Sequence, residues 1–219
     1  MTATALHRKM ARLIRINARM VRMPRLYRVQ PRNVVVKSPP LVFRSSAGPE
    51  YPRWLETLND NSQLLIRPIN KEDRIAERIF IEGLSAQARR YRFLGTVKIP
   101  SERLIEQFTD IDYVHEVAFV AVVRDDSHER IVGVSRYSTD GEGENCECAV
   151  TVSDEWQRKG LGTLLMKHLM DVARARGIHT MTSLASAENI QMRDLANHLG
   201  FRTCVDPDDA SQVIHKIDF

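Results

Sequence analysis

The sequence is poor in cysteine and has neither a long apolar run nor a metal-binding motif. Its three cysteines are Cys146, Cys148 and Cys204, and no two of them are spaced as Cys-x-x-Cys. This argues against a disulfide framework and a zinc site, and the seven histidines are scattered, so we expect no metal. No run approaches the roughly 18 apolar residues of a membrane-spanning helix. No secretory signal is evident, and a reducing, cytoplasmic setting is the simplest expectation.

Acidic residues are absent from the first part of the chain, where the first of them is Glu50. Residues 1–49 hold eleven of the 32 lysines and arginines, so the 28 acidic residues outnumber the basic ones in the remainder. This basic arm could contact nucleic acid, an anionic membrane surface or an acidic partner, or it could be a disordered tail. The acidic remainder suits a cationic substrate such as a lysine amine or a basic peptide.

The distribution of prolines and the hydrophobic periodicity predict one compact domain after an extension. Prolines punctuate the chain up to Pro52, so we expect a basic extension over residues 1–61 and the domain over residues 62–219. The predicted order of elements makes an α/β (α+β) fold, with a mixed, mostly antiparallel sheet flanked by helices. Strands are predicted over 64–68, 116–124, 130–138, 146–152, 179–184, 201–205 and 213–217, and helices over 71–84, 85–93, 101–108, 161–175 and 189–199.

A glycine-punctuated turn, Gln157–Thr163, joins the apolar run at 149–152 to the helix predicted over 161–175. Such a turn leaves main-chain N–H groups without partners at the positive end of the helix dipole. It is therefore a suitable site for a phosphate or a pyrophosphate. Gly160 and Gly162 would let the ligand approach the main chain closely, because they carry no side chain. The spacing is neither that of a Walker loop nor that of the dinucleotide fingerprint.

The turn matches Arg/Gln-x-x-Gly-x-Gly/Ala, the acyl-coenzyme A signature of the GNAT acetyltransferases, and we call Gln157–Thr163 the coenzyme loop. The sequence resembles that family from about Leu64 to Val205. Within GNAT it looks most like the acetyltransferase domain of the bacterial Pat-type protein lysine acetyltransferases. The stretches that carry this likeness are Ile66-Arg67-Pro68, Arg90-Tyr91-Arg92-Phe93, Thr109-Asp110-Ile111-Asp112-Tyr113, Glu147-Cys148-Ala149-Val150, Glu188-Asn189 and Leu199-Gly200-Phe201.

The resemblance implies acetyl-CoA as co-substrate, bound mainly through the protein backbone. Main-chain N–H groups of the coenzyme loop would hold the pyrophosphate, and main chain of the preceding strand would face the pantetheine arm. Arg158 and Lys159 could add positive charge, and Asn189 would either contact the coenzyme or cap its own helix. The expected coenzyme-binding residues are Val150, Val152, Gln157, Arg158, Lys159, Gly160, Leu161, Gly162, Thr163 and Asn189.

Glu147 is the candidate catalytic residue, as the general base. A lysine amine has a pKa of about 10.4, so a base within direct or one-water reach is useful at neutral pH. On a strand, Glu147 shares one face with Ala149 and Thr151, and partial desolvation there would make its carboxylate a stronger base. The resemblance supports this assignment, because the matching glutamate is the general base of Pat-type enzymes. A solvated strand glutamate is the alternative.

The sequence departs from the family pattern at Ala196. Many GNAT enzymes have a tyrosine at this place, which protonates the leaving thiolate. A thiol with a pKa of about 8.5 leaves tolerably as the thiolate, so no acid is strictly required. Tyr113 or a water could substitute. A covalent route through Cys146 or Cys148 is disfavoured, because no histidine is near in sequence and core packing explains both residues.

These observations predict an acetyl-CoA-dependent N-acetyltransferase that acts on a protein lysine by direct attack. Acetylation of a small amine or of a peptide N-terminus is the enzymatic alternative. A different class is a non-catalytic module that senses acyl-CoA, with its basic arm on nucleic acid or a membrane. The coenzyme loop does not separate these readings, because all of them need coenzyme binding, whereas Glu147 does.

Overall fold

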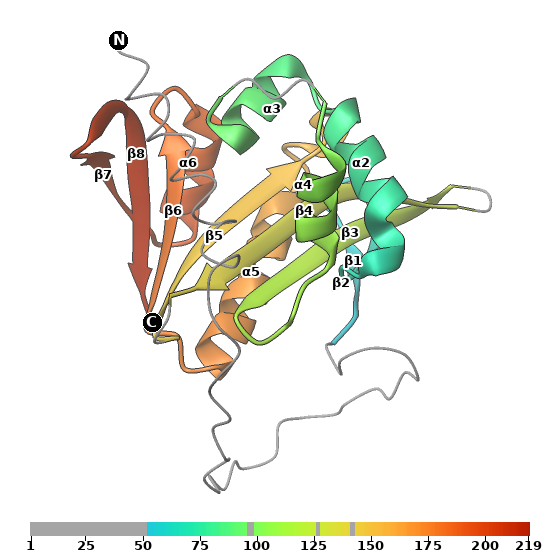
Figure 1. Ribbon diagram of the computed structural model, residues 1–219, viewed down its shortest axis with the longest axis horizontal. Helices are drawn as coiled ribbons and strands as arrows, with labels where there is room; N and C mark the ends of the chain where they lie inside the picture. The colour runs from blue at the N-terminus through green and yellow to red at the C-terminus, as the bar shows by residue number, and fades with distance from the viewer. Residues whose placement is uncertain (1–51, 96–98, 126–127, 141–142) are drawn as a thin grey trace, which may run out of the picture. The chain divides into compact units, whose positions relative to one another are not determined.

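The computed structural model describes residues 52–95, 99–125, 128–140 and 143–219. The expectations for residues 1–49 therefore lie outside the described residues. Eight strands form one sheet in the order β1-β2-β3-β4-β5-β6-β8-β7, with helices on both of its faces (Figure 1). The strands are β1 (Trp54–Thr57), β2 (Gln63–Pro68), β3 (Glu116–Asp125), β4 (His128–Thr139), β5 (Asn145–Val152), β6 (Thr180–Ser186), β7 (Arg202–Asp206) and β8 (Asp209–Asp218). The helices are α2 (Arg74–Gly83), α3 (Ala86–Phe93), α4 (Glu102–Thr109), α5 (Leu161–Ala175) and α6 (Ile190–His198), with short 3-10 turns η2 (Lys71–Asp73) and η3 (Asp154–Trp156).

The predicted fold class is confirmed, and one strand is added to it. β1 pairs antiparallel with β2, from Trp54 opposite Ile66 to Thr57 opposite Gln63. The sheet therefore begins before residue 62, the predicted start of the domain. Strand β1 is short and follows closely spaced prolines, so the hydrophobic pattern of the sequence did not predict it. No helix in the described part of the chain is long and apolar enough to cross a membrane.

Neighbouring strands run antiparallel except β5 and β6, which are parallel. This parallel pairing is short, since it covers only Asn145 to Glu147 on β5 and Thr180 to Thr182 on β6. Beyond those positions the two strands diverge, as Figure 1 shows in yellow and orange. β6 instead continues its pairing with β8 as far as Ser186. The sheet is thus split from the middle of β5 onward.

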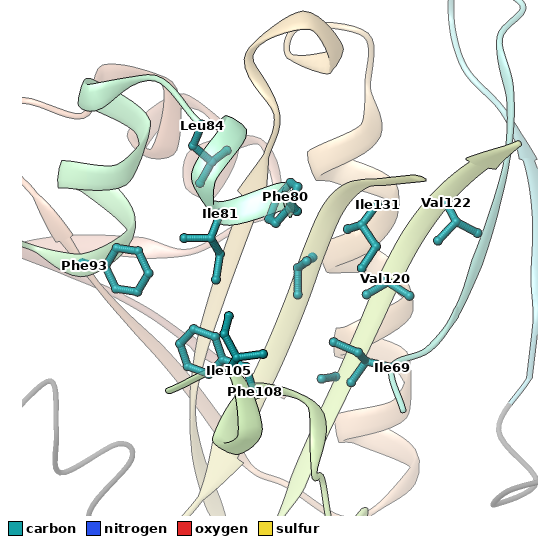
Figure 2. Packing of buried hydrophobic residues seen from close by; sticks show 12 residues of the cluster. Ile69, Phe80, Ile81, Leu84, Phe93, Ile105, Phe108, Val120, Val122 and Ile131 are labelled. Carbon is teal, nitrogen blue, oxygen red and sulfur yellow. The ribbon is translucent and has the colours of Figure 1, made fainter. Parts of the chain in front are cut away.

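Helices α2, α3 and α4 cover one face of the sheet and bury its main apolar cluster (Figures 1 and 2). Residues of β3 and β4 that are opposite each other contribute to it, such as Val120 and Val134. From the helices come Phe80, Ile81 and Phe108, all buried. The face that carries Val134 therefore lies beneath three helices, and it is the face that matters for Glu147 below.

Helix α5 covers the opposite face, where its apolar side is buried over Leu161, Leu165 and Leu169. The approach to β4 is close at Gly133: an added Cβ would lie 2.9 Å from Leu165 Cδ1 and 3.2 Å from Leu161 Cδ2. Ser135 of β4 donates a hydrogen bond to the Leu165 carbonyl at 3.3 Å. These contacts fix the first half of α5 against the centre of the sheet.

A buried ion network ties β2 to the start of α2. Arg67 donates two hydrogen bonds to Asp73, each of 2.8 Å, and a third to Glu129 at 2.8 Å. The Arg67 and Asp73 side chains are each 9% exposed, so the pair is largely removed from water. Asp73 also accepts from the Asn70 main chain in a capping box, which starts the helical segment. The network therefore fixes the start of α2 against the sheet.

Candidate active site

The split between β5 and β6 leaves main-chain groups of β5 facing an open edge. Asp140 N–H donates to Asn145 O and Ser153 N–H to Val132 O, so the odd-numbered positions of β5 bond to β4. Because bonded and non-bonded pairs alternate in an antiparallel ladder, the even-numbered positions point toward β6. The described residues contain no strand pairing for that edge beyond Glu147, so the main chain of Val150 and Val152 faces the split. Both sequence-predicted positions are there.

The coenzyme loop places glycine where the backbone requires it. Gly160 is the N-cap of α5 and has φ +91, a conformation that favours glycine, and Arg158 before it has φ 60. The first main-chain hydrogen bond of α5 is donated by Leu164 N–H to Gly160 O at 3.1 Å. The amides of Leu161, Gly162 and Thr163 therefore have no partner within the helix. No side chain caps this end of the helix.

Two further contacts shape the coenzyme loop. Gln157 Nε2 donates to Val152 O at 3.1 Å, which ties the loop to the end of β5. A Cβ on Gly162 would lie 3.4 Å from Leu195 Cδ2 of α6 and 3.9 Å from Val152 Cγ2. The bare backbone at Gly162 thus fits between α6 and β5. The loop, the start of α5 and the open edge of β5 form one continuous main-chain surface.

The two basic side chains of the loop differ in their surroundings. Arg158 is exposed. Lys159 Nζ lies 3.0 Å from Asp60 Oδ2 and 4.8 Å from the centre of the Trp156 ring. Both residues were predicted from the sequence to add charge for the phosphates, and the position of Asp60 beside Lys159 was not predicted.

Glu147 lies on the face of the sheet that α2, α3 and α4 cover. It is opposite Ser138 of β4 and Thr182 of β6. Ala149 and Thr151 share this face, because they are opposite Arg136 and Val134. The predicted division of β5 into two faces is therefore confirmed. Glu147 is half-buried and lies at the last paired position before the split, so its carboxylate is close to where β5 and β6 separate.

A cluster of charged side chains lies on the same face of the sheet. It consists of Glu77 of α2, which is buried, and of Arg92 of α3 and Arg136 of β4, which are half-buried. Both guanidinium groups contact the Phe108 ring, whose centre is 5.0 Å from that of Arg92 and 4.2 Å from that of Arg136. Glu77 Oε2 and Arg136 Nε are buried without a hydrogen-bond partner among the described residues. Arg136 is opposite Ala149, so the cluster borders the Glu147 face directly.

Burial dominates the ionisation of this cluster. It raises the pKa of Glu77, and the attraction of Arg136 and Arg92 only partly offsets the effect. Burial lowers the pKa of Arg92 to about 10 and also lowers that of Arg136. The carboxyl of Glu116, opposite Ser138, has a pKa raised by burial as well. The face around Glu147 thus carries several charged groups whose pKa values are shifted by burial.

Helix α3 bridges the two sides of the split on this face. Its N-cap Ser85 accepts a bond from Ala88 N–H and is itself held by Asp154 of η3, with Ser85 Oγ 2.7 Å from Asp154 Oδ1. Toward its other end, Arg90 pairs with Glu188 in the segment between β6 and α6, and Tyr91 donates to the Glu188 carbonyl at 3.3 Å. Helix α3 therefore joins the end of β5 to the end of β6.

The remaining candidate residues have structural surroundings. Asn189 accepts from Met192 N–H at 3.1 Å, so it caps α6, and its contact with a coenzyme stays a prediction. Ala196 is buried. Burial raises the pKa of the Cys146 thiol to about 12 and that of Cys148 well above its ordinary value, so neither is poised as a thiolate. The Tyr113 hydroxyl donates to Ile69 O, and burial raises its pKa.

Comparisons with known proteins agree with this geometry. A Pseudomonas aeruginosa protein named as an acetyltransferase is 49% identical over 176 residues, which are 80% of this chain and 95% of that protein. The acetyltransferase Pat of Mycolicibacterium smegmatis is 28% identical over 111 residues, which are 50% of this chain but 33% of that longer protein. The crystal structure of the GNAT domain of S. lividans PAT has a TM-score of 0.71 and 25% identity, and the match covers 78% of this chain and 100% of that domain.

The family pattern covers more than half of the chain. The family model of the Acetyltransferase (GNAT) family matches residues 85–201, from the N-cap of α3 to the residue before β7. This range includes β5, the coenzyme loop, α5 and Glu147. It leaves out β1 and the turn that carries Asp60. From the fold, the match and the relatives together, the chain belongs to the GNAT family of acetyltransferases.

Proposed function

We propose that the protein transfers an acetyl group from acetyl-CoA to the side-chain amine of a lysine in another protein, with Glu147 as general base. The observation that carries the proposal is the place of Glu147. It is the last residue of β5 paired with β6, directly before the edge whose main chain faces the split. One strand thus presents a candidate base at one end and a candidate coenzyme surface at the other.

The residues of the split fit the coenzyme A moiety. The even-numbered positions of β5 beyond Glu147 direct main-chain groups toward the split, with Val152 O already bonded to Gln157, and the pantetheine arm carries amide groups that could pair with the others. The amides at the start of α5 suit a pyrophosphate, because they combine unpaired N–H groups with the helix dipole. Gly162 carries no side chain at this point, so its main chain is open to close approach by a ligand. Acetyl-CoA would supply the activated acetyl thioester.

Glu147 would take the proton from the attacking amine, directly or through one water. The rate benefit of such a base is typically about 10²- to 10⁴-fold. A main-chain N–H of β5 in the split would stabilise the negative charge that develops on the carbonyl oxygen. No residue is assigned as the acid for the leaving thiolate, because Ala196 has no proton to donate and Tyr113 is bonded to Ile69 O.

A protein lysine is favoured as the acceptor on two grounds. The sequence resembles Pat-type protein lysine acetyltransferases, and relatives named Pat and PAT are among its matches. Acidic residues outnumber basic ones after residue 49, which suits a cationic acceptor. A small amine and a peptide N-terminus remain the enzymatic alternatives. A contact of residues 1–49 with nucleic acid or an anionic membrane, and a cytoplasmic location, remain proposals from the sequence.

The Glu147→Gln variant tests the mechanism. We expect it to bind acetyl-CoA as wild type does, measured by calorimetry, and to lose at least about 10²-fold in kcat. Glu144→Gln is the matched control, since Glu144 is an exposed carboxylate just before β5. Unchanged turnover in Glu147→Gln would remove Glu147 as the base. If wild type binds acetyl-CoA but acetylates no amine or protein, the sensing module is the better reading.

The acceptor is tested by mass spectrometry of proteins incubated with acetyl-CoA and the full chain. The proposal expects acetylated lysines that are absent when Glu147→Gln replaces wild type. Acetylation confined to protein N-termini, or to small amines supplied in parallel, would favour the alternatives.

A further inference from the structure

We propose that Asp60, in the turn between β1 and β2, is a positioning residue for coenzyme binding: it holds Lys159 and thereby sets the coenzyme loop. The inference rests on the proposed use of that loop for acetyl-CoA. Asp60 lies outside residues 85–201, which match the family pattern. It would act through Lys159 and not touch the ligand itself.

The turn between β1 and β2 contacts the loop at consecutive residues. Asp60 Oδ2 lies 3.0 Å from Lys159 Nζ. Asn59 N–H donates to Lys159 O at 3.4 Å. The Asn59 carboxamide lies beside the next residue, since a Cβ on Gly160 would be 3.4 Å from Asn59 Nδ2. Side chain and main chain of the loop are thus both held, directly before the amides at the start of α5.

Asp60 is itself held in place before it meets Lys159. The Ser62 N–H donates to Asp60 Oδ1 at 3.1 Å, and Leu58 N–H donates to Ser62 O at 2.9 Å, which closes the turn. Asn61 has φ 63, a conformation that asparagine tolerates. The bonds to Lys159 and Ser62 lower the pKa of Asp60 to about 2, so the carboxylate is ionised at neutral pH. The Asp60 carboxylate is therefore a fixed anion that can pair with Lys159.

The turn is anchored to α5 at a second place. Trp54 of β1 stacks on His168 of α5, with ring centres 3.9 Å apart and planes at 18°. Glu56 Oε1 lies 2.7 Å from His168 Nε2. The β1–β2 hairpin therefore contacts both the middle of α5 and the coenzyme loop directly before α5. A hairpin held in this way can keep the loop in one shape before the coenzyme arrives, which saves ordering cost on binding.

An opposite reading makes a different prediction about the same pair. If Lys159 were a direct phosphate ligand, Asp60 would compete with the coenzyme, and removing its charge would tighten binding. If Asp60 positions the loop, removing its charge weakens binding. The two readings therefore differ in the sign of the effect on affinity.

The experiment measures acetyl-CoA affinity by calorimetry and steady-state kinetics for full-length Asp60→Asn. We expect the dissociation constant and the KM for acetyl-CoA to rise about threefold to fivefold, the size of one partly exposed ion pair, with kcat nearly unchanged. Asp60→Glu should recover part of the affinity. Asp218→Asn is the control for losing an exposed ion pair outside the site, because Asp218 pairs with Lys216 at 3.3 Å and also with Arg202 and Thr180.

A double-variant cycle with Lys159→Met identifies the route. In that background, Asp60→Asn should add no further loss, because the partner is already gone. Unchanged or tighter binding by Asp60→Asn, or an equal further loss in the Lys159→Met background, overturns the inference. Failure of wild type to bind acetyl-CoA would instead overturn the proposed function, so the two failures are distinguishable.

Discussion

The two ends of β5 are built in different ways. At its C-terminal end the site is made of main chain: the open edge at Val150 and Val152, the glycines of the loop and the amides at the start of α5. At its N-terminal end it is made of side chains that come from distant segments. Glu147 has Ser138 and Thr182 as strand neighbours and the charged side chains of Glu77, Arg92 and Arg136 on its face of the sheet.

The difference explains why the coenzyme-binding part of the candidate site is easier to recognise in the sequence than the part around Glu147. A surface made of backbone needs glycine and a helix start at fixed spacing, so it is local. A surface made of side chains needs only that several strands and helices bring them together. We therefore expect changes at the C-terminal end to alter coenzyme affinity, and changes near Glu147 to alter turnover or ionisation.

The largest effect is expected at the Arg67 network, which lies outside both ends of β5. It tests whether one rigid part of the fold supports both ends. Arg67→Met leaves Asp73 and Glu129 without their shared cation. Because the pair with Asp73 is largely buried, we expect the free energy of unfolding to fall by about 3–5 kcal/mol. Urea unfolding followed by circular dichroism measures it, with Arg103→Met, an exposed arginine of α4, as control. A loss no larger than that of the control would show that the network does not support the frame.

Gly160→Ala sharpens the comparison at the coenzyme end. The residue has φ +91, so an added Cβ strains the backbone by roughly 1–3 kcal/mol. We expect acetyl-CoA affinity, measured by calorimetry, to fall about twofold to tenfold if half of that strain opposes binding. kcat at saturation should change little.

Gly143→Ala is the matched control for that variant, because Gly143 has φ +77 in the turn before β5, at the other end of the strand. An added Cβ there meets nothing within 4 Å. The same kind of strain should lower stability there without changing coenzyme affinity. Equal losses of affinity in both variants would break the comparison.

The smallest effect concerns ionisation at the other end. Burial raises the pKa of Glu77 above its ordinary value of 4.5, so the folded state holds this proton more tightly than the unfolded chain. The contribution of the group to stability is full below pH 4.5 and is lost as the pH rises through the folded pKa. Glu77→Gln imitates the protonated form.

The free energy of unfolding of Glu77→Gln, relative to wild type, should therefore grow as the pH rises from 4 toward 8. Its slope is at most about 1.4 kcal/mol per pH unit. Chemical unfolding at a series of pH values measures it, with Glu82→Gln as the control, since Glu82 is exposed on the same helix. A difference that shrinks with pH would show that Glu77 is held as the anion.

Local sequence patterns predicted most of the helices and strands. Each feature that they missed depends on contacts with residues distant in the sequence. The helices and strands from Leu64 onward follow hydrophobic periodicity, and caps at Ser85, Ser101 and Asn189 begin three of the helices. β1 was missed because its strand character comes from pairing with β2 and from Trp54 packing on Phe119 and His168. The early end of the β5–β6 pairing has no local signature, since it depends on where β6 meets β8.

The candidate site divides in the same way. Glu147 and the coenzyme loop were found from residue type and spacing, and their roles stay predictions. Asp60 could not be found, because nothing near it in sequence points to Lys159. The stretches around Arg67, Arg92 and Tyr113 were noticed as family likeness without a physical reason. The structure supplies one: they build the buried polar contacts under α2, α3 and α4, which hold the face that carries Glu147.

An unpaired strand edge normally lies at the rim of a sheet, where it invites aggregation, but here it lies in the interior. The open side of β5 is flanked by β6 and bridged by α3, which shields it more than the rim of a sheet, and the proposed coenzyme would pair with it through the amides along its pantetheine arm. Recognition of this kind ignores side-chain identity. Substitutions at Val150 and Val152 that keep strand geometry should therefore be tolerated, and the acceptor side could diverge toward new amines while the donor stays the same.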